Sequence, residues 1–122
     1  MNKYQALHDF WCSFGLPAYD IYSVPVNAEL PYLTYSVSIG AIDEPVFMSV
    51  SLWYRSDSWV EIDRKANEIE QKLGTGGQVL KLDNGRLFLF RGTPFARRLN
   101  DMNDTKIKQI FINIGAEFFT AY

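Results

Sequence analysis

Cysteine and histidine are nearly absent from this 122-residue sequence, in which Cys12 and His8 are the only examples. A single thiol excludes an intrachain disulfide, so the cysteine content gives no sign of an oxidising compartment. The two side chains stand four residues apart in a predicted helix, where a thiol and an imidazole can meet. No third group that would orient such a pair is apparent in the sequence. We interpret both as structural or surface residues, with covalent catalysis as the alternative.

Long apolar runs are also missing. No stretch of about 18 apolar residues occurs, so we expect no transmembrane helix. The N-terminal residues lack the basic stretch and apolar core of a secretory signal, which predicts action in the cytoplasm of the cell that makes the protein. Internal repeats and low-complexity tracts are absent as well, and the length fits one domain spanning residues 1–122.

An excess of positive charge is the third missing feature. The formal net charge is −2, which argues against a general nucleic-acid binder, and we expect no specific nucleic-acid partner. Six basic residues nevertheless fall between positions 86 and 108, where only Asp101 and Asp104 oppose them. We interpret this segment, with a local net charge of +4, as a solvated loop. A contact with an acidic partner or with passing DNA is the alternative.

Hydrophobic residues, by contrast, make up 48% of the chain, and their spacing predicts a strand followed by a helix at residues 46–54 and 58–73. Alternation over 46–54 places every second side chain on one face, as in a half-buried strand. Ser58 and Glu61 have the spacing of a capping box at the start of the helix. Apolar residues three and four apart then form a single stripe. We expect the helix to lie on the sheet and to bury both apolar surfaces.

The first third of the chain predicts a helix, an irregular connection and a hairpin. The helix covers residues 2–14 and ends at Gly15. Three prolines disfavour a central strand within residues 16–31. Alternation over 33–39 then predicts a strand that pairs with 46–54 as an antiparallel hairpin.

A second hairpin is predicted from residues 78–82 and 86–90. Asn84 and Gly85 suit the two central positions of a type I′ turn, which would pair Asp83 with Arg86. Four leucines then share the face toward the core. The opposite face carries Val79, Lys81, Phe88 and Phe90. An outer face that is half apolar needs a second layer or a partner, which indicates oligomerisation.

The C-terminal third predicts a loop over residues 92–106 and a closing strand over 110–114. Gly115 is interpreted as a bulge, and the aromatic terminus as tied down against its own domain or a neighbour. The Asn/Asp cluster at 100–104 lacks the glycine and glutamate of a calcium loop. The glycine-rich segment 74–77 follows a helix instead of preceding one, unlike a phosphate-binding loop. We therefore predict no metal, no cofactor and no catalytic residues.

Together these elements predict an α+β fold. The order is helix, two strands, helix and three strands. The sheet is antiparallel or mixed with about five strands, and the two helices pack mainly on one face.

Several short sequence segments accompany this order of elements. They are Pro31-Tyr32-Leu33-Thr34-Tyr35, Leu52-Trp53-Tyr54, Ser58-Trp59-Val60-Glu61, Asp83-Asn84-Gly85-Arg86 and Arg91-Gly92-Thr93-Pro94-Phe95. With them, residues 30–115 resemble the tail terminator, or tail-completion, proteins of long-tailed bacteriophages and prophages. Related head–tail connector and minor capsid proteins share much of the pattern and are the alternative.

The resemblance implies a structural virion protein that breaks no bonds and has no membrane partner. Such proteins assemble in the bacterial cytoplasm as rings, commonly hexamers, on the end of the tail tube. Their expected partners are further copies, the tail tube protein and a head-completion or connector protein. By inference, the candidate contact residues lie in the segment 92–106 and on the outer face of the second hairpin. They are Phe88, Phe90, Arg91, Phe95, Arg97, Arg98 and Lys106.

Overall fold

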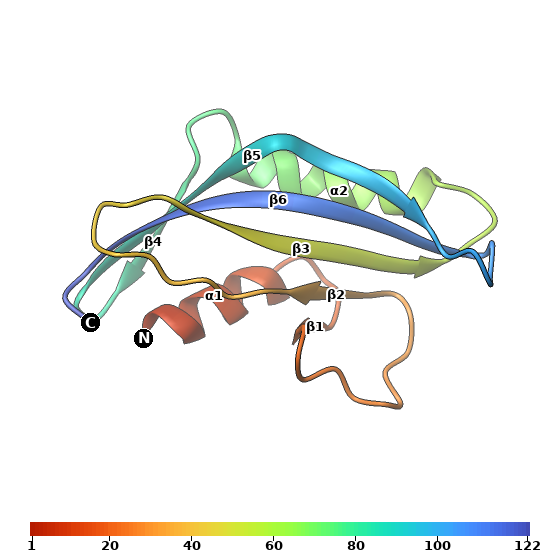
Figure 1. Ribbon diagram of the computed structural model, residues 1–122, viewed down its shortest axis with the longest axis horizontal. Helices are drawn as coiled ribbons and strands as arrows, with labels where there is room; N and C mark the ends of the chain where they lie inside the picture. The colour runs from red at the N-terminus through yellow and green to blue at the C-terminus, as the bar shows by residue number, and fades with distance from the viewer.

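The computed structural model describes residues 1–122 and has the predicted α+β fold, with two helices and six strands (Figure 1). The helices are α1 (Lys3–Cys12) and α2 (Val60–Leu73). The strands are β1 (Ala18–Asp20), β2 (Tyr32–Tyr35), β3 (Val46–Arg55), β4 (Gln78–Leu82), β5 (Gly85–Asn100) and β6 (Ile107–Thr120).

All six strands form one mixed sheet in the order β1-β2-β3-β6-β5-β4. Only the β1–β2 pair is parallel. The long strands β3, β6 and β5 form the centre and bow along their length (Figure 1). The sheet has one strand more than expected, because three residues of the proline-rich connection form β1 at its edge.

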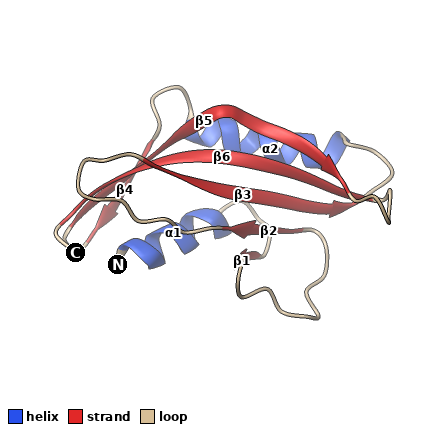
Figure 2. Cartoon of the chain, viewed as in Figure 1, coloured by secondary structure: helices blue, strands red, loops and turns tan.

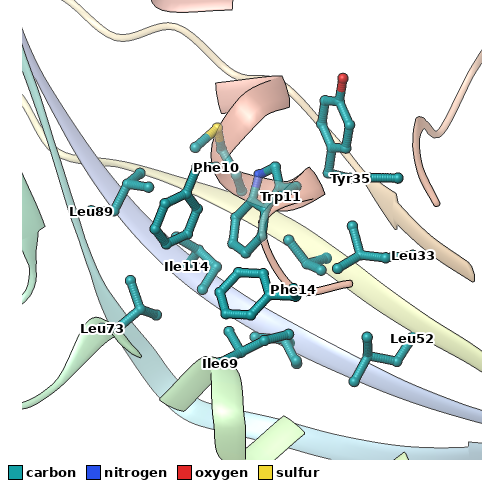
Figure 3. Close-up of a cluster of buried hydrophobic side chains, with 14 of the residues drawn as sticks. Phe10, Trp11, Phe14, Leu33, Tyr35, Leu52, Ile69, Leu73, Leu89 and Ile114 are labelled. Atoms are coloured by element: carbon teal, nitrogen blue, oxygen red, sulfur yellow. The ribbon is translucent and has the colours of Figure 1, made fainter. Parts of the chain in front are cut away.

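Both helices cover the same face of the sheet, as predicted. In Figure 2 they lie behind the strands, so the viewer looks onto the face without helices. Side chains from both helices and five strands form a single core of 22 buried residues. Figure 3 shows its centre, where Phe14 lies between Trp11 and Ile69. Burying such large apolar side chains is the main source of stability in a domain of this size.

Helix α1 begins with a capping box that the sequence analysis did not identify. The Asn2 side chain accepts from the Gln5 backbone N–H at 2.9 Å, and the Gln5 side chain accepts from the Asn2 backbone N–H at 3.0 Å. The box predicted for α2 was wrong. Its N-cap is Trp59, which makes no side-chain capping bond. The Trp59 ring instead packs under the Arg98 guanidinium, whose central carbon lies 4.8 Å from the ring centroid, so tertiary contacts set where α2 begins.

The β4–β5 hairpin forms with the predicted faces but a different register. Leu82 pairs with Gly85 and Leu80 with Leu87, so the turn residues are Asp83 and Asn84, not Asn84 and Gly85. Gly85 has a φ of 155° and passes so close to the β6 backbone that any side chain would collide with it. That approach is open only to glycine and draws Gly85 into the strand.

The loop predicted for residues 92–106 was wrong. Residues 92–100 continue β5, and only 101–106 connect β5 to β6. A bulge interrupts the pairing: Arg91 pairs with Ile114 and Ala96 with Ile112, so four residues of β5 face Asn113 alone. The Asn113 side-chain amide donates to the Pro94 carbonyl at 2.7 Å. This irregularity removes the alternation by which a strand is recognised in sequence.

Strand β6 extends far beyond the predicted 110–114 and pairs along its length with β3 and β5. Gly115 is not a bulge, because it pairs in register with Phe47 on one side and Phe90 on the other. Of the C-terminal aromatic residues, Phe118 is fully buried in the core of its own domain, whereas Tyr122 is exposed. Strand β2 ends at Tyr35, short of the predicted 39.

Candidate interaction surfaces

The sheet face opposite the helices, here called the open face, carries a cluster of three phenylalanines from two strands, β3 and β5. Phe47 and Phe90 flank Gly115 in one row across β3, β6 and β5. The Phe47 and Phe90 rings meet edge to face with centroids 6.5 Å apart, and Phe88 stacks on Phe90 at 5.5 Å. Phe47 is 65% exposed, so the cluster presents apolar surface to solvent.

Two glycines fix the positions of these rings. The Phe90 ring occupies the space above Gly115 that a side chain would fill. The Phe88 ring similarly lies above Gly77, where an added Cβ would come within 2.5 Å of it. The rings therefore lie flat on the backbone and form a low, rigid surface. Such a surface loses little side-chain entropy when a partner covers it.

Farther along the open face, polar and aromatic side chains alternate. The Trp53 indole N–H donates to Thr34 Oγ1 at 3.0 Å, and the Gln109 amide donates to Ser51 Oγ at 3.1 Å. The Arg97 guanidinium lies over the Phe111 ring, with its central carbon 5.6 Å from the centroid. The open face thus combines apolar anchors with satisfied polar groups, as protein interfaces do.

The seven residues predicted for contact do not form one surface. Phe88, Phe90 and Arg97 project from the open face, on the side of β5 away from the helices. Arg91 and Arg98 point to the helix face, where they pair with acidic residues of α2: Arg91 lies 3.3 Å from Glu70, and Arg98 lies 2.5 Å from Asp63.

The remaining two predicted residues lie apart from both groups. Phe95 is half-buried against the core beside the bulge. Lys106 lies in the β5–β6 connection, with its ammonium 3.8 Å from Asp57. In the same connection, the Asp104 carboxylate accepts from the Arg55 guanidinium at 2.8 Å. The hydrogen bond from the Lys106 backbone N–H is the main cause of a lowered pKa at Asp104, and the hydrogen bond from Arg55 is the second cause.

An open groove of about 450 Å³ runs between α2 and β5. Ala66, Asn67 and Glu70 line one wall, and Phe95, Ala96 and Arg98 line the other. The groove exists because β4 is short. It pairs with β5 only as far as Leu89, and beyond that residue no strand covers the outer edge of β5.

His8 and Cys12 do come together, and the structure adds a third group. Cys12 Sγ lies 3.4 Å from His8 Nε2, and His8 Nδ1 lies 2.8 Å from the Tyr35 hydroxyl. Burial, with Asp9 as a second cause, raises the pKa of the Cys12 thiol. A nucleophilic cysteine needs the opposite shift. We therefore interpret the chain Cys12–His8–Tyr35 as a link between α1 and β2.

No group of three or more His, Cys, Asp or Glu side chains has an arrangement that could hold a metal ion. Neither α1 nor α2 has the length and hydrophobicity that a membrane-spanning helix requires.

Three aromatic residues of the open face were not among the predicted contact residues: Phe47, Trp53 and Phe111. The signal for the first two was present, because alternation that buries Met48 and Leu52 turns Phe47 and Trp53 to the other side. The contribution of Gly115 could not be anticipated, since it depends on the register between β5 and β6.

The chain matches no family model, and neither a curated protein nor a solved structure is significantly similar to it.

Proposed function

We propose that this chain is a structural subunit that assembles into a ring and caps the tail tube of a long-tailed bacteriophage or prophage. In this role it ends polymerisation of the tube and provides the surface to which the head docks. The subunit breaks no bonds. It works in the virion after assembly in the host cytoplasm, with the tail tube protein and a head-completion protein as its neighbours.

The observation that carries the proposal is the open face with its cluster of Phe47, Phe88 and Phe90. An exposed cluster of three rings on an uncovered sheet, two of them held against glycine backbone, is typical of a surface that another protein covers. Repeated contacts of one kind between identical subunits form a ring when the rotation between neighbours closes, and a closed ring ends a polymer that otherwise grows. The order of elements and the short sequence segments quoted above are the basis of the resemblance to tail terminators.

Electron microscopy of the purified protein mixed with preformed tail tubes tests the proposal. We expect rings of the protein at one end of each tube, and tubes whose length stays constant when more tube protein is added. A protein that remains monomeric by sedimentation and leaves tube growth unchanged contradicts it. Binding to head vertices without any binding to tubes would assign the chain to the connector class instead.

A further inference from the structure

Positive charge is confined to one half of the sheet. No lysine or arginine occurs between Tyr4 and Tyr54, a stretch that holds five acidic residues and includes β1, β2, all of α1 except Lys3, and all of β3 except Arg55. None of these five carboxylates has an ion-pair partner within the chain. They are Asp9, Asp20, Glu29, Asp43 and Glu44. Two of the five, Asp20 on β1 and Glu29 in the connection to β2, lie at the β1 edge of the sheet, which therefore carries negative charge without a counterion.

The segment 21–31 projects from this acidic edge (Figure 1). It joins β1 to β2 and exposes apolar side chains: Tyr22 is 93% exposed, and Val26 is fully exposed. Glu29 is also exposed within it. An exposed segment that combines apolar and acidic side chains has the chemistry of a docking element for a basic, partly apolar groove.

The opposite edge of the sheet offers a partly apolar groove that contains one unpaired cation, Arg97. Beyond Leu89 the outer edge of β5 is uncovered, so its backbone groups are free to pair with another chain. Arg97, on this edge, has no acidic partner within the chain. The groove-lining carboxylates Asp63 and Glu70 are already paired, with Arg98 and Arg91 respectively. Ala66, Phe95 and Ala96 supply apolar lining.

The projecting segment and the uncovered edge of β5 also lie at the same position along the strand direction. Tyr32, which follows the projecting segment directly, pairs with Trp53. Trp53 pairs with Gln109, and Gln109 pairs with Leu99 of β5. One row across the sheet therefore runs from the acidic segment to the uncovered edge, so a copy placed beside another brings the two surfaces together with little displacement along the strands.

We propose that segment 21–31 of one copy seats in the groove between α2 and β5 of the next copy, so that subunits join head to tail. The inference rests on the proposed ring function and names its subunit contact. A symmetric contact between two β5 edges would place Arg97, which has no acidic partner, against its own copy. A symmetric contact between two β1 edges would oppose carboxylates that have no counterion. Like-charge contacts of this kind cost affinity, which leaves the head-to-tail arrangement.

Cysteine pairing tests the contact in a Cys12→Ser background. The full chain carrying both V26C and A96C is oxidised at concentrations at which the protein without engineered cysteines assembles. We expect a ladder of cross-linked species that ends at the ring. Each single variant alone should give no cross-link, and the two single variants mixed should give a dimer and nothing larger. The pair V26C and T75C, with the second cysteine away from the groove, is the matched control and should give no ladder.

Charge reversal provides a second readout that needs no cross-link. We expect Arg97→Glu to raise the concentration for half-assembly by about tenfold or more, because the acidic segment then faces a like charge. Adding Glu29→Lys to the same chain should restore assembly toward the original value. The same unfolding midpoint for all variants shows that folding is intact.

The outcomes separate the contact from the ring function. If the protein forms rings but the double cysteine variant gives no ladder, or a single variant cross-links to itself, the head-to-tail contact is overturned and the ring function stands. If the unmodified protein assembles neither alone nor on tail tubes, both the head-to-tail contact and the ring function are contradicted.

Discussion

At the scale of single residues, Gly115 determines the shape of the open face. Its position directly beneath the Phe90 ring lets the ring lie on β6, from where it reaches both Phe47 and Phe88. Glycine weakens a strand interior by about 0.5–1 kcal/mol relative to alanine, so its presence here has a local packing reason.

A change of Gly115 to alanine should therefore destabilise the protein by about 1–3 kcal/mol, because the methyl group displaces the Phe90 ring. In a Phe90→Ala background the same change should be neutral or slightly stabilising, since the collision is gone. Urea unfolding of the four proteins in this double-mutant cycle measures the coupling. Equal costs in both backgrounds would mean that the ring does not depend on the glycine.

Tyr54 gives a prediction of pH dependence. Burial raises its pKa above the usual 10.0, and Glu61 and Glu68 add to the shift. Because the pKa is higher in the folded state, the stabilisation is complete below pH 10 and is lost as the pH rises through the unfolded and then the folded pKa. We expect Tyr54→Phe to reduce the loss of stability between about pH 9 and 11, measured by urea unfolding. Tyr22→Phe, at an exposed side chain, is the control, and an equal reduction there would contradict the assignment.

At the scale of elements, the two helix starts differ in a way that mutation can measure. We expect Asn2→Ala to cost about 1 kcal/mol, because it removes the side-chain acceptor of the capping box at α1. Ser58→Ala should cost less than about 0.5 kcal/mol, because the Ser58 hydroxyl lies at 3.4 Å from the nearest helical N–H and α2 begins without it. Thermal unfolding compares the two variants. A larger loss of stability for Ser58→Ala than for Asn2→Ala would support the capping box that the sequence predicted at α2.

The elements that sequence predicted well are those with strict periodicity. The stripe of Ile62, Ala66, Ile69 and Leu73 gave α2, and the alternation over 46–54 gave β3. Where the period is broken, prediction failed. The bulge after Arg91 hid half of β5, and the close approach of Gly85 to β6 shifted the β4–β5 turn by one residue. Both depend on contacts between segments distant in sequence.

The candidate surface followed the same pattern. Phe88 and Phe90 were identified because a local hairpin decides which way they point. Arg91 and Arg98 were predicted as contact residues, but they form ion pairs with α2 that only the folded chain brings together.

At the scale of the whole molecule, the open face is the only sheet surface without helices, and Phe47 is its most exposed aromatic side chain. We expect Phe47→Ser to change the free energy of unfolding by less than about 1 kcal/mol and to weaken binding to tail tubes by tenfold or more, as at interface hot spots. Val60→Ser removes a similarly exposed apolar side chain from the helix side and should leave tube binding unchanged. Equal effects of the two changes would show that the open face is not the binding surface. Pelleting with tubes measures the binding.

The separation of charge described above gives each molecule a permanent dipole across its sheet. Two such molecules in dilute salt turn toward end-to-end alignment before they touch, which narrows the orientations in which they collide. The Debye length is about 10 Å at 0.1 M salt, so added salt should slow the joining of subunits far more than their separation.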